Sequence, residues 1–346
     1  MNLMNILQNV SLAAYSTMGL GGPAAYLALV SSRDELVEAY RWAQERQLPV
    51  LMIGGGSNII WQDSGFDGLV LVNKIMGYEV SPLGDADFEV KVGAGEPWDS
   101  VVARSVAAGL SGIEALSLIP GSSGGTPVQN VGAYGQEIAH SLKTVEAFDT
   151  QSGEFVQIAA EDCQFKYRDS RFKSADRGRY LIVSLTLRLA KANPQPPFYP
   201  AVQAYFGQKG ITEPSPADLR AAVIAIRSAK LPDPAVVRNT GSFFSNPIIG
   251  EEQFARLAAQ FPNLPNWPMS DGRIKLSAAW LIEQAGFKDY HDSGTGMATW
   301  PSQPLVLVNE KARSTADLMA FKHRVVASIQ AKYGITLVQE PELLPH

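Results

Sequence analysis

Two glycine-rich segments could bring main-chain N–H groups close to a ligand. The first, Gly54-Gly55-Gly56-Ser57-Asn58, follows the apolar run 50–53, which predicts a buried strand. Glycines allow a close approach, and consecutive amides can bind an anion, although a tight turn is the simpler interpretation of one glycine triplet. The segment lacks the G-x-G-x-x-G of dinucleotide-binding folds and the GK[ST] of P-loops, so neither of those sites is predicted.

The second segment, residues 119–135, is almost uncharged and rich in small residues. This composition allows contact with a flat ligand, but a structural Ω-loop has the same composition. Two such segments, one in each of two α+β units, favour a large ligand that lies between the units.

The flanking sequence predicts the elements that hold these segments. Strand patterns occur at 26–30, 50–53, 68–73, 87–92, 144–148, 181–189 and 305–308. Helices are predicted after the capping box 32–35, between Pro97 and Gly109, from Ser215-Pro216 to residue 230, and near 251–260, 275–285 and 315–332. The Pro-rich run 193–200 predicts a loop or insertion, and Leu231-Pro232-Asp233-Pro234 a domain boundary. This mixture indicates the α+β class.

Bulk composition excludes several classes of protein. With 346 residues, 46% of them hydrophobic and 18% charged, the chain is predicted to be globular with two or three domains. It has no apolar run long enough for a membrane helix, and residues 1–5 do not predict a signal peptide. Cys163 is the only cysteine, so an internal disulfide is impossible and a cytoplasmic location is expected. A net charge of −5 gives no general attraction to nucleic acid or anionic lipid. The histidines are far apart, so no metal site is predicted.

Six motifs in a fixed order carry a resemblance to one enzyme family. They are 17–23 (TMGLGGP), 54–58, 119–135, 167–170 (YRDS), 230–234 (KLPDP) and 241–247 (GSFFSNP). Together they resemble the UDP-N-acetylenolpyruvoylglucosamine reductases, from about residue 11 to residue 346. The ordered set is far more specific than any one motif.

The resemblance implies an activity. Members reduce the enolpyruvyl ether of UDP-N-acetylglucosamine to UDP-N-acetylmuramate, a step of peptidoglycan precursor synthesis that supports cell wall formation, cell shape and cell division. Non-covalent FAD is the expected cofactor and NADPH the co-substrate. We expect a cytoplasmic monomer whose only partners are these small molecules.

The resemblance also implies a fold. We expect an FAD-binding part with two subdomains, of the vanillyl-alcohol oxidase type, followed by an α+β substrate-binding domain. The predicted ranges are 1–73 and 74–230 for the subdomains, with an insertion at 193–212, then 231–335 for the substrate domain and 336–346 for a segment that returns to the active site. The expected cofactor-binding residues are Gly54, Gly55, Gly56, Ser57, Asn58, Gly121, Ser122, Ser123, Gly124, Gly125, Thr126, Gln129, Asn130, Gly132 and Ala133.

The chemistry requires three kinds of group. A hydride adds to the enolpyruvyl methylene carbon, charge develops toward the carboxylate, and a proton must reach the adjacent carbon. By resemblance, Ser242 donates this proton, Arg168 stabilises the enolate and Glu342 is a second acid. Alternatively, Gly241-Ser242 is only a turn and Arg168 forms a surface salt bridge. Leu343–His346 replaces the family's usual hydrophobic and basic strand, which leaves open how Glu342 is held, with Glu340 as the alternative acid.

Substrate contacts are expected from residues that match family positions, namely Tyr134, Tyr205, Arg227, Lys230, Asn246 and Gln303. Arg227 and Lys230 share a helix face, which suits a diphosphate but also suits pairing with the helix C-terminus. Tyr205 is expected on a loop that closes over the substrate. Ser245 replaces a residue that is often basic in the family.

Two other functions remain possible from the sequence. A different FAD-dependent oxidoreductase of the same fold often carries its flavin covalently on a histidine, and neither glycine segment contains one. A non-catalytic nucleotide-sugar binding module would be a colourless protein.

Overall fold

The chain folds into two compact units. The computed structural model describes residues 5–346. Residues 1–4, which belong to the range where no signal peptide is predicted, lie outside the described residues. Unit 1 contains the described residues up to Val10 together with Ala24–Gly55 and Phe66–Ala229. Unit 2 contains Ser11–Pro23, Gly56–Gly65 and Lys230–His346. Two short early segments therefore belong to the same unit as the C-terminal third.

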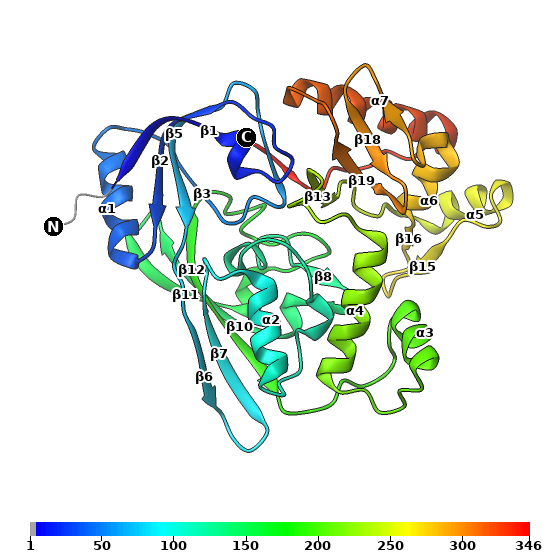
Figure 1. Cartoon of the computed structure of the whole chain (residues 1–346), viewed down its shortest axis with the longest axis horizontal. Coiled ribbons are helices and arrows are strands. Elements are labelled where there is room, and N and C mark those ends of the chain that lie inside the picture. Colours follow the sequence, from blue (N-terminus) through cyan, green and yellow to red (C-terminus); the bar gives the residue numbers. More distant parts are fainter. Residues whose placement is uncertain (1–4) are drawn as a thin grey trace. The chain divides into compact units, whose positions relative to one another are not determined.

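The first sheet of unit 1 is mostly parallel. Its strand order is β1 (Ile6–Ser11), β2 (Pro23–Val30), β5 (Phe66–Asn73) and β3 (Val50–Ile53), and β5 pairs in parallel with both β2 and β3. Helix α1 (Arg33–Gln44) lies beside this sheet (Figure 1) and buries Leu36, Ala39 and Ala43. The predicted cap is present, because the Ser32 hydroxyl accepts a hydrogen bond from the Glu35 N–H at 3.1 Å.

The second sheet of unit 1 is antiparallel. Its order is β11 (Glu154–Ala159), β10 (Leu142–Asp149), β12 (Tyr180–Ala190), β7 (Asp87–Gly93) and β6 (Tyr78–Pro82). Helix α2 (Trp98–Ala107) buries Trp98, Val101 and Val102 in the core of this sheet. Pro97 immediately precedes the helix, and Gly109 follows it with a φ of +71° that favours glycine. The loops between these elements contain the short strands β8 (Gly132–Ala133) and β9 (Gln136–Glu137) and helical turns at Glu114–Leu116, Ser123–Gly125, Ile138–His140 and Ala160–Cys163.

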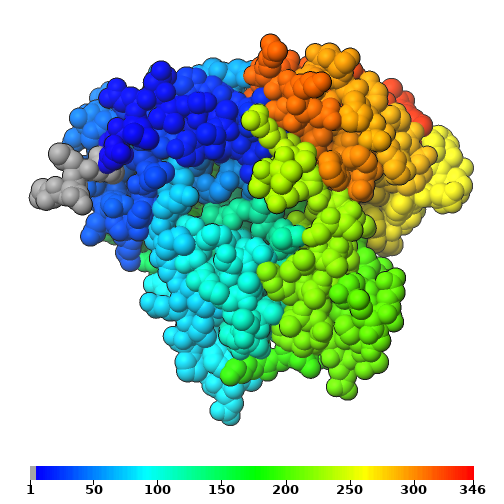
Figure 2. Space-filling model, in the orientation of Figure 1, coloured from blue at the N-terminus to red at the C-terminus, as the bar shows by residue number. Residues whose placement is uncertain are grey.

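Two helices complete unit 1. Residues 193–199 are irregular as predicted, but α3 (Pro200–Lys209) then begins inside the range predicted as an insertion. Val202 and Phe206 of α3 pack against Leu219 and Val223 of α4 (Pro216–Lys230) in a small separate core. In the space-filling view, the green and yellow-green atoms of α3 and α4 adjoin each other (Figure 2).

Unit 2 is built on a four-stranded sheet with helices packed on one face. The strand order is β13 (Asn239–Ser242), β19 (Gln303–Asn309), β18 (Met297–Trp300) and β17 (His291–Asp292). Phe321, Val325 and Ile329 of α7 (Thr315–Tyr333) pack in one core with Leu305 and Leu307 of β19. The remaining elements are β14 (Ile248–Ile249), α5 (Glu251–Gln260), β15 (Asn266–Pro268), β16 (Ile274–Leu276), α6 (Ala278–Ile282), a helical turn at Glu283–Phe287, β4 (Ile59–Trp61) and β20 (Glu342–Leu344).

One predicted helix of unit 2 begins late. The range 275–285 was expected to be helical, but residues 274–276 form β16, which pairs with both β14 and β15. Helix α6 begins only at Ala278, where the Ser277 hydroxyl accepts a hydrogen bond from the Trp280 N–H at 3.2 Å. Pairing with two neighbouring strands therefore overrides the helical pattern at its first residues.

None of the helices formed by residues 5–346 combines the length and apolar composition needed to span a membrane. The same residues contain no group of histidine, cysteine and carboxylate side chains that could hold a metal ion.

Candidate active site

The two glycine segments meet in unit 1. A Cβ atom added to Gly54 would lie 1.9 Å from the Ser122 Oγ atom, and one added to Gly55 would lie 2.9 Å from the Gly121 Cα atom. A side chain at either position would force a neighbour to move, and at Gly55 that neighbour is main chain. The Ser122 hydroxyl is buried and has no hydrogen-bond partner within residues 5–346. A tight main-chain contact beside an unpaired hydroxyl suits a polar ligand, because a buried hydroxyl is costly unless it is bonded.

The second glycine segment is held by its own hydrogen bonds. The N–H groups of Ser123 and Gly124 donate to the carbonyls of Glu96 and Ala94, each at 2.9 Å. The Thr126 hydroxyl donates to the Ser123 carbonyl at 2.7 Å. These bonds fix the loop next to the end of β7, so its shape is set before any ligand binds.

Asn130 also shapes this segment. Its side-chain amide donates to Glu137 Oε2 at 2.7 Å and to the Lys166 carbonyl at 3.2 Å. Its Oδ1 atom accepts from the Ala139 N–H at 3.3 Å, and the residue is 2% exposed. The Asn130 side chain therefore holds this segment to Glu137, Lys166 and Ala139.

Gly56, Ser57 and Asn58 belong to unit 2, where the motif at 17–23 packs against them. Gly56 has a φ of +69°, and a Cβ atom there would lie 2.2 Å from the Tyr15 carbonyl oxygen. The Thr17 N–H donates to the Gly56 carbonyl at 3.1 Å. The first and second family motifs thus meet through their main chains.

Arg168 lies at the tip of a tight turn and contacts the second glycine segment. The main chains of Lys166 and Asp169 bond to each other at 3.0 and 3.2 Å. Arg168 itself has a φ of +56°, a left-handed conformation that is costly for a residue with a side chain. Its Nη2 atom donates to the Gly132 carbonyl at 3.0 Å. The guanidinium is thus directed to the glycine segment of unit 1, which favours a site role over a plain surface salt bridge.

Ser242 ends strand β13 at the point where the C-terminal segment joins the sheet. The preceding Gly241 has a φ of +71°, and Phe243 and Phe244 are fully buried. The Phe243 N–H donates to the Leu305 carbonyl at 2.8 Å, and the Phe243 carbonyl accepts from the Glu340 N–H at 2.9 Å. The half-buried Ser242 therefore precedes two buried aromatic residues. It is next to Phe243, whose main chain bonds to Glu340.

The main chain of Glu342, whose fixation the sequence left open, is held on strand β20 (Glu342–Leu344). Strand β20 pairs in parallel with β4, and the Glu342 N–H donates to the Asn58 carbonyl at 2.9 Å. Gln62 donates from its main chain to the Leu344 carbonyl at 2.7 Å and from its side chain to the Pro345 carbonyl at 2.8 Å. Pairing with distant residues 58–62 therefore fixes this glutamate beside Asn58 of unit 2.

Tyr134 and Arg227 form a buried pair in unit 1. Burial raises the pKa of the Tyr134 hydroxyl, which is bonded to the Arg227 side chain. Burial also lowers the pKa of the Arg227 guanidinium, against the opposing effects of Tyr134 and Asp99. The Arg227 Nε atom is buried without a hydrogen-bond partner in the described chain. Lys230, the last residue of α4, is exposed.

Tyr199, which the sequence did not single out, contacts the predicted substrate residue Tyr134, whereas Tyr205 packs in a core. Tyr205 lies within helix α3, not on a loop, and packs in the small core against Phe206. Tyr199 precedes the helix, is 44% exposed, and its ring meets the edge of the Tyr134 ring at a centroid distance of 5.4 Å.

The other predicted substrate residues lie in unit 2. The Asn246 side chain accepts a hydrogen bond from the Ala278 N–H at 3.0 Å and thereby helps to begin α6. Gln303 is the half-buried first residue of β19. The sequence missed Trp267, which is 42% exposed. Lys275 lies opposite it on β16, with its ammonium 5.9 Å from the indole centroid.

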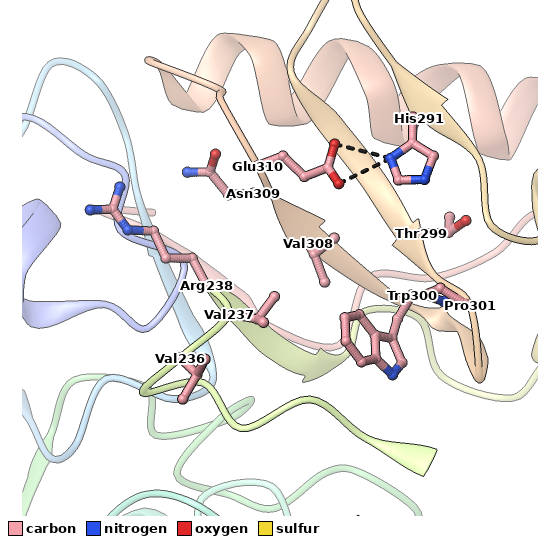
Figure 3. Close-up of a pocket in the computed structure, with 10 residues that line it drawn as sticks. All are labelled: Val236, Val237, Arg238, His291, Thr299, Trp300, Pro301, Val308, Asn309 and Glu310. Atoms are coloured by element: carbon pink, nitrogen blue, oxygen red, sulfur yellow. Dashed lines mark hydrogen bonds and ion pairs between the residues drawn. The ribbon is translucent and has the colours of Figure 1, made fainter. Parts of the chain in front are cut away.

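A cavity of about 460 Å³ in unit 2 lies apart from the predicted catalytic residues. Figure 3 shows Trp300, Val308 and the ion-paired His291 and Glu310 around it, with Arg238 at one side. Arg238 lies against Gly19, where an added Cβ atom would be 2.7 Å from its Cδ atom. None of Ser242, Glu342 and Gln303 lines this cavity, so it is not the predicted active site.

Comparison with known proteins gives the family. A profile described as FAD binding domain matches residues 24–159, and one described as UDP-N-acetylenolpyruvoylglucosamine reductase, C-terminal domain, matches residues 233–344. A UDP-N-acetylenolpyruvoylglucosamine reductase of Cupriavidus pinatubonensis is 41% identical over 338 residues, covering 96% of this chain and 97% of the relative. The chain belongs to the UDP-N-acetylenolpyruvoylglucosamine reductase family. The reductase of Thermobifida fusca is 40% identical over 350 residues and covers 97% of both chains.

The predicted fold class and cofactor are confirmed. The crystal structure of the reductase from Thermus caldophilus matches with a TM-score of 0.69 at 24% identity, covering 99% of this chain and all of that one. The FAD-binding profile contains both glycine segments. Their main-chain contact and the unpaired Ser122 hydroxyl fit a bound FAD, since flavin nucleotides offer acceptor oxygens along their whole length.

Proposed function

We propose that this reductase-family protein converts UDP-N-acetylglucosamine enolpyruvate to UDP-N-acetylmuramate with NADPH as reductant, in peptidoglycan precursor synthesis. One observation carries the proposal. The C-terminal segment bonds to Phe243 through Glu340 and to Asn58 through Glu342, at 2.9 Å in each case. It thereby joins residues 56–58 of the first glycine segment and the motif at 241–247 to residues 340–342, within unit 2. By resemblance, these three segments supply a cofactor contact, the proton donor Ser242 and the second acid Glu342, in that order.

FAD, when bound, supplies a hydride to the enolpyruvyl methylene carbon. The main chain of Gly54, Gly55 and Gly121 and the Ser122 hydroxyl would hold it in unit 1.

The remaining groups manage charge and protons. Arg168 binds the enolpyruvyl carboxylate and stabilises the negative charge that develops there, because a guanidinium stays charged and donates in two directions. Ser242 gives its hydroxyl proton to the carbon next to the carboxylate. Serine is a weak acid, so its oxygen must be stabilised as the proton leaves. Glu342 is the acid that supports this transfer.

We assign the nucleotide-sugar contacts to two sets of residues. Tyr134, Tyr199, Arg227 and Lys230 form one set, whose aromatic and cationic groups suit a sugar diphosphate. Trp267, Lys275, Asn246 and Gln303 form the other, in which an exposed indole beside an ammonium suits a nucleobase and its phosphate. Residues 231–335 then act as the substrate-binding domain and 1–73 and 74–230 as the FAD-binding subdomains. Nucleotide substrates and a single cysteine fit a cytoplasmic monomer.

The test is a visible spectrum of the purified protein, followed by anaerobic additions. We expect a bound yellow flavin that NADPH bleaches. Enolpyruvyl-UDP-N-acetylglucosamine should then restore the colour and yield a product heavier by two hydrogen atoms in mass spectrometry. A colourless protein that binds no FAD, or a reduced flavin that this compound cannot reoxidise, would refute the proposal.

A further inference from the structure

The Glu342 carboxylate has a partner that the reaction scheme does not include. Its Oε2 atom lies 3.2 Å from the Nε2 atom of His346, four residues later. The Glu342 side chain is 16% exposed and the His346 side chain 32% exposed. A single nitrogen on one oxygen leaves the other oxygen of the carboxyl group for a different partner.

The main chain before His346 is fixed on both sides of the contact. Gln62 bonds to the carbonyls of Leu344 and Pro345, and Leu344 is 6% exposed. Strand pairing with β4 fixes Glu342 at the other end. The imidazole is therefore presented by a rigid main chain, whereas the glutamate side chain alone would rotate about three torsions. Orienting such a group is what a positioning residue does in acid–base catalysis.

We propose that His346 is a positioning residue that holds the Glu342 carboxyl group in one orientation for the proton transfer at the substrate. This inference rests on the proposed function, because it takes Glu342 as the second acid. The imidazole acts through an N–H donated to Oε2 and does not itself contact the substrate. A glutamine at position 346 has a comparable N–H donor without the ring, whereas an alanine has none.

The kinetic test separates the two half-reactions by stopped flow. In His346→Ala, NADPH should reduce the flavin at the wild-type rate, and reoxidation by the enolpyruvyl substrate should slow about fivefold, the upper range for a partly exposed ion pair. His346→Gln should recover most of the lost rate. In the Glu342→Gln background, His346→Ala should cause no further loss. The control His323→Ala changes an exposed histidine of α7 in the same unit and should behave like wild type.

A second readout needs no flavin. The chain has four histidines, so a histidine-labelled apoprotein gives few ring nitrogen signals in long-range ¹H–¹⁵N NMR, and His346→Ala identifies its own. Glu342→Gln should shift the His346 ring nitrogen resonances and leave those of His323 in place.

The outcomes are distinct. Unchanged His346 signals in Glu342→Gln, wild-type reoxidation in His346→Ala, or equal slowing in His346→Ala and His346→Gln would each overturn the inference. If Glu342→Gln itself reoxidises normally, the catalytic role of Glu342 fails. If that variant is slow and His346→Ala is not, only the role of His346 fails.

Discussion

Alanine at position 55 tests the contact between the two glycine segments. The added Cβ atom would lie 2.9 Å from the Gly121 Cα atom, whereas ordinary contacts begin at 3.4 Å, so one main chain must move by about 0.5 Å. Gly55 has no left-handed φ, so the clash is the only strain introduced. Both partners are main chain and cannot rotate away. Overpacking of this kind costs about 1–3 kcal/mol.

The cost should appear in cofactor binding. If the strain falls on the bound state, the dissociation constant for FAD rises about 5- to 150-fold, since 1.4 kcal/mol is tenfold. Fluorescence titration of the apoprotein with FAD measures this, and denaturant unfolding of the apoprotein measures any strain that falls on the fold. Gly84→Ala is the control, because an added Cβ atom there meets nothing within 4 Å. An FAD affinity within about twofold of wild type, with unchanged unfolding, would refute the reasoning.

Three further predictions follow from single residues. Ser242→Ala should keep its flavin and its reduction by NADPH but lose at least about 10²-fold in turnover of the enolpyruvyl substrate, the usual loss of a general acid; normal turnover would remove Ser242 from the mechanism. Gly207→Ala, inside α3 with open space around the added atom, should raise the free energy of unfolding by about 0.5–1 kcal/mol in urea titrations, and a decrease would show that α3 is strained there. Burial alone would raise the pKa of Asp99, but the bidentate hydrogen bonds from Arg220, at 2.7 and 2.9 Å, the Leu118 N–H and the charges of Arg220 and Arg227 together lower it. The stabilisation is therefore present above the unfolded pKa and lost as the pH falls through the folded pKa, so Asp99→Asn should cost about 1–2 kcal/mol at pH 7 and progressively less in acid; an equal cost at all pH values would contradict this.

Local signals predicted the elements well where capping chemistry decides them. Ser32 caps α1, the Ser215 main chain and hydroxyl both bond to Asp218 at the start of α4, and α5 spans the predicted range. The failures are non-local. Residues 274–276 become a strand because β14 and β15 flank them, and α3 begins at Pro200 because its apolar face packs on α4.

The resemblance nominates candidate site residues but does not show which segments pair in the fold. Ser242, Arg168 and Glu342 remain predictions, and no periodicity shows that Glu340 bonds to Phe243 or Glu342 to Asn58. Those pairings join segments far apart in the chain, and their register depends on packing. For the same reason the contribution of residues 11–23 and 56–65 to unit 2 was not foreseen. Tyr199 and Trp267 stand out only through their exposure in the folded chain.

Strand pairing of the C-terminal segment, in which Leu343 and Leu344 take part, explains how Glu342 is held. Residues 338 and 340 bond to 245 and 243, and residues 342–344 pair with 59–61, so Pro341 alone separates two different sheet contacts. Pro341 is buried and cannot donate a main-chain hydrogen bond, so it forms no ladder bond of its own at this transition. Adding one residue there would move Glu342 by about 3.3 Å along β4 and turn its side chain to the opposite face. The spacing Glu340-Pro341-Glu342 therefore fixes where the proposed second acid lies relative to Ser242 along the strand.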